Sequence, residues 1–134
     1  MKITQFLFVL SLSIGLSASL NAAELVKEVK IIEASQPEVT ILGVPSGLTA
    51  YIFDNDSNGV PVCYAKCAEV WPPILLTAKE EATLKAPLGF VKRTTGTSQL
   101  THNGKPLYLY FADRVEGNIL GDGIGGAWHI VEVK

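Results

Sequence analysis

The chain has 134 residues, two cysteines and a formal net charge of −2 at pH 7. This length suits one small compact domain. Because acidic residues outnumber basic ones and no basic run occurs, the composition argues against a nucleic acid as the partner.

The first 23 residues have the layout of a secretory signal peptide. Lys2 supplies a positive charge, and residues 6–16 (FLFVLSLSIGL) form an uncharged apolar run. The small residues at 17–23 suit cleavage by a signal peptidase. The apolar run is shorter than the roughly 20 residues that cross a bilayer, so we expect no membrane span after cleavage. The sequence therefore predicts export to the periplasm or secretion, with residues 24–134 as a single β-rich domain.

The mature part is rich in short segments with strand character, separated by Gly, Pro, Asn and Ser. These predicted strands are residues 25–33, 39–42, 48–53, 90–93, 97–102, 105–111 and 127–133. Asn103-Gly104 is typical of a type I′ turn and predicts a tight hairpin. The fold class that follows is mainly β, a small antiparallel β domain.

Two short helices are expected to interrupt the strands. Thr77 and Glu80 have the spacing of a capping box and predict a helix that begins after Thr77 and ends before Pro87. Residues 64–70 (YAKCAEV) predict a turn or two of helix that ends at Pro72, because proline cannot continue a helix.

The mature chain matches itself at an offset of 57 residues without a gap. The matched pairs are Gly47 and Gly104, Tyr51 and Tyr108, Phe53 and Tyr110, Asp56 and Asp113, and Trp71 and Trp128. Since both tryptophans of the chain take part, chance is a poor explanation. We therefore predict two pseudo-symmetric repeat units, at about 40–76 and 97–133, that bury their apolar faces against each other.

These residues resemble the bacterial secreted-repeat family of unknown function, whose members are predicted lipoproteins with a Yx(FWY)xxD motif. The resemblance covers roughly residues 40–133 and includes YIFDND at 51–56 and YLYFAD at 108–113. It implies an exported location but no specific activity. The chain lacks a cysteine near the cleavage region, so we do not expect a lipid anchor.

The repeated motif allows a structural and a functional interpretation. In the structural one, Tyr51, Tyr108 and their aromatic neighbours fill the core. Asp56 and Asp113 then cap the turn after their strand, accept backbone hydrogen bonds, or pair with Arg93 or Arg114. In the functional one, the two aspartates form a paired-carboxylate site with aromatic walls. We favour the structural interpretation, because a duplicated fold needs duplicated core residues.

Cys63 and Cys67 lie four residues apart in a chain predicted to enter an oxidising compartment. One helical turn would place their Cα atoms roughly 6 Å apart, which a disulfide tolerates. A disulfide is therefore the first prediction. The alternative is a copper or redox site made by the two thiols with His129, since thiolate and imidazole both suit copper.

Two further sequence patterns are weaker indications of function. Asp54, Asp56, Asn58 and Gly59 match the opening of a calcium loop, but Ala65 stands where the bidentate glutamate belongs. The glycine-rich stretch 117–126 lacks the ending of a phosphate loop and predicts a surface loop.

Together these observations predict an exported, non-enzymatic binding or structural module without a cofactor, whose partner would be another envelope protein. The alternative is a periplasmic copper-handling or electron-transfer accessory that uses Cys63, Cys67 and His129. No Ser-His-Asp arrangement or zinc-ligand spacing points to a hydrolase.

Overall fold

The computed structural model describes residues 24–31 and 39–134. The predicted signal peptide lies outside these residues, as does the end of the strand predicted at 25–33. The described chain is mainly β, which confirms the predicted fold class. Its strands are β1 (Lys27–Ile31), β2 (Val39–Gly43), β3 (Tyr51–Phe53), β4 (Leu75–Leu76), β5 (Leu88–Lys92), β6 (Ser98–His102), β7 (Lys105–Pro106) and β8 (Trp128–Ile130).

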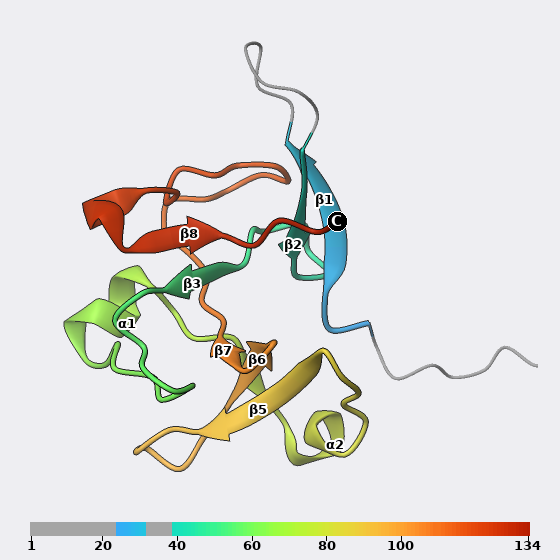
Figure 1. Ribbon diagram of the computed structural model, residues 1–134, viewed down its shortest axis with the longest axis vertical. Helices are drawn as coiled ribbons and strands as arrows, with labels where there is room; N and C mark the ends of the chain where they lie inside the picture. The colour runs from blue at the N-terminus through green and yellow to red at the C-terminus, as the bar shows by residue number, and fades with distance from the viewer. Residues whose placement is uncertain (1–23, 32–38) are drawn as a thin grey trace, which may run out of the picture.

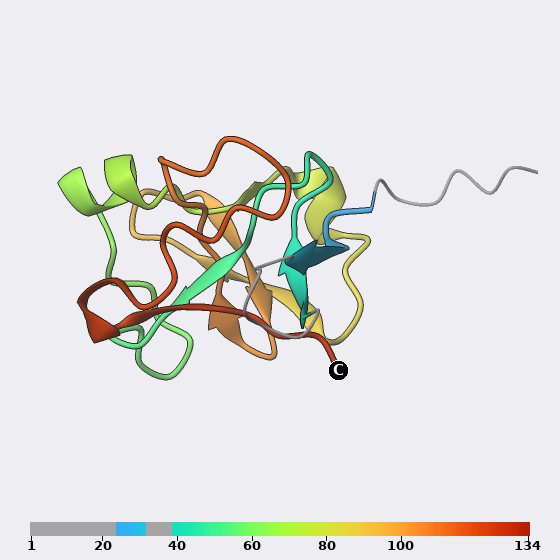
Figure 2. The same cartoon turned by 90° about the horizontal axis from the view of Figure 1, so that it is seen from above.

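The strands pair antiparallel in three small sheets. β1 pairs with β2, β3 pairs with β8, and the third sheet has the order β4-β6-β5 with β7 also on β6. Figure 1 shows the paired strands β1 and β2 in the upper part of the view and β5, β6 and β7 in the lower part. Helix α1 (Lys66–Val70) and the 3₁₀ turn η1 (Ile124–Gly126) lie at the same end of the molecule in Figures 1 and 2.

The backbone hydrogen bonds between the two halves follow the offset of 57 residues. At the centre, Tyr51 N donates to Tyr108 O over 2.8 Å, and Tyr108 N donates to Tyr51 O over 2.9 Å. Two other bonds are related by the same offset: Asp54 N to Ala127 O at 2.8 Å, and Phe111 N to Val70 O at 2.9 Å. Each bond thus joins one half to the other, with a pseudo-twofold relation that passes between Tyr51 and Tyr108.

The last segment of each half forms backbone hydrogen bonds with the first strand of the other half, which is β2 in the first half and β6 in the second. Leu42 N, in β2, donates to Val131 O over 2.8 Å, although Val131 belongs to the second half. Leu100 N, in β6, donates to Ile74 O over 2.8 Å, although Ile74 belongs to the first half. Val131 and Ile74 are themselves equivalent at the offset of 57. The two halves therefore exchange their final segments.

The strand predicted at 105–111 was too long. Only Lys105–Pro106 forms a strand, and Tyr108 beyond it makes isolated bridges to Tyr51 and Pro73. The facing segment contains Pro72 and Pro73, which have no N–H group to extend a ladder of backbone hydrogen bonds. Leu109 N still donates to Pro72 O over 2.8 Å, and Ile74 N donates to Leu107 O over 3.0 Å, so backbone hydrogen bonds hold the segment on either side of this bridge.

The other expected elements are present with shifted bounds. The strand predicted at 48–53 is limited to Tyr51–Phe53, because the residues before it turn back onto β2, where Ala50 N donates to Leu42 O. Thr77 and Glu80 form the predicted capping box of α2 (Ala78–Glu81). Asn103 and Gly104 both have positive φ, at 49° and 77°, as a type I′ turn requires.

In the described part of the chain, no helix is long and apolar enough to cross a membrane.

Candidate functional site

Four aromatic rings form a continuous stack through the centre of the molecule. Trp71 and Trp128 lie face to face at 3.8 Å with an interplanar angle of 1°. Phe53 stacks on the outer face of Trp128 at 4.0 Å, and Tyr110 lies against Trp71 at 4.4 Å. Each outer ring thus covers the indole of the opposite half. The order of the stack, Phe53–Trp128–Trp71–Tyr110, is what a twofold relation between equivalent residues produces.

The first tyrosine of each motif packs edge-on against this stack. Tyr51 meets Trp71 at 5.3 Å and 78°, and Tyr108 meets Trp128 at 5.2 Å and 88°. Edge-to-face pairs of this kind add about 0.5–1.5 kcal/mol beyond the burial of their area. Both tyrosines are fully buried, and both tryptophans nearly so. The tyrosines and tryptophans of the motif therefore fill the core.

The carboxylates of the motif also cross between the halves. The Tyr51 hydroxyl donates to Asp113 Oδ2 over 2.6 Å. Asp113 Oδ1 accepts from Leu120 N, and the Tyr51 oxygen accepts from Gly121 N. Burial raises the pKa of the Asp113 carboxyl above its usual range. Burial and the adjacent Asp113 likewise raise the pKa of Tyr51. This pair is fully hydrogen-bonded.

The equivalent pair, Tyr108 and Asp56, is bonded differently. Asp56 Oδ1 accepts from Val62 N over 2.9 Å. Asp56 Oδ2 and the Tyr108 hydroxyl are both buried and lack a hydrogen-bond partner among the described residues. The two groups are close enough that Asp56, after burial, is the main cause of a raised Tyr108 pKa, although their geometry falls short of a hydrogen bond. Burial raises the pKa of Asp56 as well.

The two aspartates do not form a paired-carboxylate site. Each lies beside the tyrosine of the opposite half, and each accepts a backbone N–H six or seven residues further along the chain. This arrangement agrees with the structural interpretation of the motif. Neither aspartate forms an ion pair with an arginine among the described contacts.

Cys63 and Cys67 are joined by a disulfide, with their Cα atoms 5.3 Å apart. Cys63 is fully buried and packs in the same cluster as the stacked tryptophans. Its carbonyl oxygen accepts from Arg93 Nη2 over 2.7 Å, and the Arg93 guanidinium lies over the Tyr64 ring. Arg93, named from the sequence as a candidate ion-pair partner of the aspartates, instead donates to this carbonyl and to Gln99 Oε1 over 2.6 Å.

His129 lies apart from the cysteines. Its Nε2 forms a 2.7 Å contact with Asp54 Oδ2, and both side chains are about half exposed. Across residues 24–31 and 39–134, no three His, Cys, Asp or Glu side chains are grouped as metal ligands would be. The structure therefore does not assemble Cys63, Cys67 and His129, nor the calcium loop considered at Asp54–Gly59.

The glycine-rich loop takes part in the core through Gly121. A Cβ atom at this position would lie 2.6 Å from Trp71 Cη2 and 2.9 Å from Tyr110 Cγ. Only a glycine allows the loop to approach the stack this closely. The expectation of a surface loop at 117–126 is therefore correct for its exposed residues but misses the buried Gly121.

Residues 89–132 match a protein family described as a secreted repeat of unknown function. The resemblance to the secreted-repeat family is confirmed for this segment. It contains the second copy of the motif, with Tyr108, Asp113 and Trp128. The description of the secreted repeat supports an exported protein. No curated protein and no solved structure matches the chain.

Proposed function

We propose that the mature chain is a non-enzymatic binding or structural module that works in the periplasm. The observation that supports this most is the use of the motif. Its tyrosines, tryptophans and one aspartate are buried in contacts between the two halves. Side chains occupied in this way stabilise the fold and are not free to act on a substrate. The partner that suits this role is another protein of the cell envelope.

The disulfide supports the same location. Cys63 and Cys67 close a small loop over α1, and such bridges persist in the periplasm but not in the reducing cytosol. The Arg93 contact to the Cys63 carbonyl connects this loop to the start of the β5–β6 turn. The bridge thereby fixes the local geometry beside the aromatic stack.

The copper-handling or electron-transfer alternative stays a prediction with a distinct requirement. It needs Cys63 and Cys67 as free thiols, and it needs His129 to leave Asp54 and approach them. Nothing in the geometry favours either change, so we rank this function second.

A thiol titration of protein folded in the periplasm separates the two functions. We expect no free thiols before denaturation, and no stoichiometric binding of Cu(I). The Cys63→Ser, Cys67→Ser double variant is the matched control and should behave in the same way towards Cu(I). Two free thiols in the folded protein, with one Cu(I) bound and binding lost in the Cys63→Ser variant, would overturn the module in favour of the accessory.

A further inference from the structure

One short stretch of chain joins the two repeat units. We call residues 24–76 the N-terminal part, residues 88–134 the C-terminal part and residues 77–87 the connector. The main contacts of the core lie between the two parts: the stacked tryptophans and the backbone hydrogen bonds between the two buried tyrosines. Each contact needs one N-terminal part and one C-terminal part. None of them requires that both parts come from the same chain.

The connector crosses over the third sheet. β4 and β5 both pair antiparallel with β6, on its opposite sides, so they run parallel to each other. Leu76 lies opposite Ser98, and Leu88 lies opposite His102, at the other end of β6. With about 4.8 Å between strands and a rise of about 3.4 Å per residue, roughly 17 Å separates the two ends of the connector. An extended connector reaches roughly 40 Å, so its length exceeds this need about twofold.

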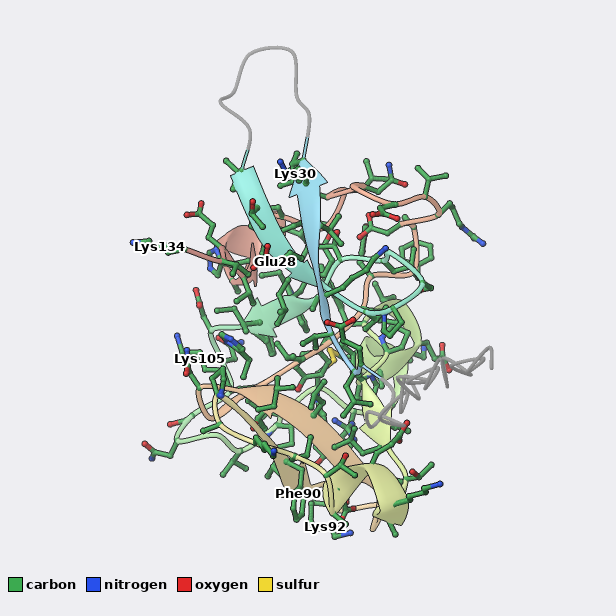
Figure 3. The ribbon with its side chains drawn as sticks, turned by 90° about the vertical axis from the view of Figure 1, so that its right-hand side faces the viewer. Glu28, Lys30, Phe90, Lys92, Lys105 and Lys134 are labelled. Carbon is green, nitrogen blue, oxygen red and sulfur yellow. A yellow bond between two sulfur atoms is a disulfide. The ribbon has the colours of Figure 1, made fainter. Side chains whose placement is uncertain are left out.

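Few contacts hold the connector in its closed position. Its helix α2 has no buried residue, and the side-chain bonds of Glu81 go to Lys92 and Ser98, both in the C-terminal part. A pocket of about 300 Å³ lies between the connector and residues 24–26 of the N-terminal part. Figure 3 shows α2 near the lower edge of the molecule, beside Lys92. Opening the connector therefore removes little from the core beyond the packing of Leu84.

We propose that this chain binds a second copy of itself in a reciprocal dimer, in which the N-terminal part of each chain pairs with the C-terminal part of the other. Each such pairing forms one lobe, and the two opened connectors run between the lobes. Both lobes keep the interface of the monomer, with Trp71 of one chain stacked on Trp128 of its partner. Because closure within one chain is intramolecular, the monomer prevails at low concentration, and folding at high concentration favours the dimer. This inference concerns assembly and does not depend on the proposed function.

A shortened connector tests this arrangement. Deletion of residues 78–83 leaves a connector that reaches roughly 20 Å, which is too short to pass around β6 from one end to the other. We expect the deletion variant to be a dimer by size-exclusion chromatography with light scattering, at concentrations where the wild type is a monomer. The matched control replaces residues 78–83 with a Gly-Ser segment of equal length, so it loses the same side chains and should stay a monomer. A folded, monomeric deletion variant would overturn the proposal, as would a control that dimerises to the same extent.

Two tryptophan variants distinguish exchange from side-by-side association. In the deletion variant, Trp71→Phe and Trp128→Phe each remove one indole from every lobe, so neither dimer contains the stacked tryptophans. When the two variants are refolded together, a mixed dimer combines both intact tryptophans in one of its two lobes. Random pairing should therefore restore about a quarter of the circular dichroism that the stacked indoles give in the unsubstituted deletion variant. No return of this signal after joint refolding would overturn the exchange.

The wild-type chain supplies the test if the deletion variant fails to fold. The Cys63–Cys67 disulfide lies within the N-terminal part, so it can stay intact during refolding. Refolding at roughly 1 mM should give a dimer fraction at least tenfold larger than refolding at roughly 1 μM. This dimer should persist after dilution, because its dissociation requires both tryptophan stacks to break. Monomer alone at both concentrations would overturn this inference and would leave the thiol titration, which tests the proposed function, unaffected.

Discussion

Tyr51 and Tyr108 are both fully buried, but only the Tyr51 hydroxyl donates a hydrogen bond to a carboxylate. A hydrogen bond to a charged group stabilises a protein by about 1.5–3 kcal/mol. Tyr51→Phe should therefore lower the free energy of unfolding by about 2 kcal/mol. Tyr108→Phe removes a hydroxyl without a partner and should cost less than about 0.5 kcal/mol. Urea unfolding of both variants measures the difference. Equal costs would contradict the inequality of the two pairs.

The raised pKa values of Asp56 and Asp113 predict an unusual dependence of stability on pH. A carboxyl whose pKa is higher in the folded state binds its proton more tightly there than in the unfolded chain. These two groups therefore stabilise the fold at low pH, and this contribution is lost as the pH rises from about 4 through their folded pKa values. Asp56→Asn should flatten the slope of unfolding free energy against pH above about 4, where the unfolded carboxyl ionises and the folded one still holds its proton. An unchanged slope would contradict the burial argument.

Sequence reasoning identified these residues but not their partners. The offset of 57 pairs Tyr51 with Tyr108 and Asp56 with Asp113 as equivalents. It contains no information on whether Tyr51 meets the aspartate of its own motif or that of the other. The difference between the two Tyr–Asp pairs could not be predicted either. Both copies of the motif have the same residue types, and the difference arises from small displacements of their side chains.

At the scale of secondary-structure elements, the matched segments that follow Trp71 and Trp128 show how proline changes a strand. His129 and Ile130 occupy the places of Pro72 and Pro73 at the offset of 57. His129 and Ile130 pair with Ile52 and Tyr51 in a regular ladder. The prolines cannot donate, so their segment makes one isolated bridge, between Pro73 and Tyr108, instead of a ladder. The prolines were visible in the sequence, but their effect on the opposite strand required knowledge of the pairing.

The glycine-rich loop yields a second test at this scale. Gly121→Ala would place a methyl group against Trp71 and Tyr110, and such overpacking costs about 1–3 kcal/mol. It should also change the near-ultraviolet circular dichroism that the stacked indoles produce. Gly123→Ala is the matched control, because its Cβ meets nothing within 4 Å and only its φ of +81° is strained. We expect it to cost about 1 kcal/mol and to leave the spectrum unchanged. Identical spectra for the two variants would contradict the close approach of Gly121.

For the whole molecule, the sequence predicted an exported, mainly β chain with internally matched residues. It did not predict that the halves exchange their final segments. The offset is the same whether Val131 bonds to the hairpin of its own half or to Leu42 of the other. Exchange places both tryptophans between the halves, where they stack on each other. One half alone would leave its indole and its tyrosine exposed, so each depends on the other for its core.

The stack of Trp71 on Trp128 carries the central claim that the two halves share one interior. Trp71→Ala and Trp128→Ala should each lower the free energy of unfolding by about 3–5 kcal/mol. Because the two rings contact each other, the double variant should lose at least about 1 kcal/mol less than the sum of the single losses. A double-mutant cycle by chemical unfolding measures this coupling directly. Losses that add within about 0.5 kcal/mol would show that the indoles do not share an environment, and would contradict the account.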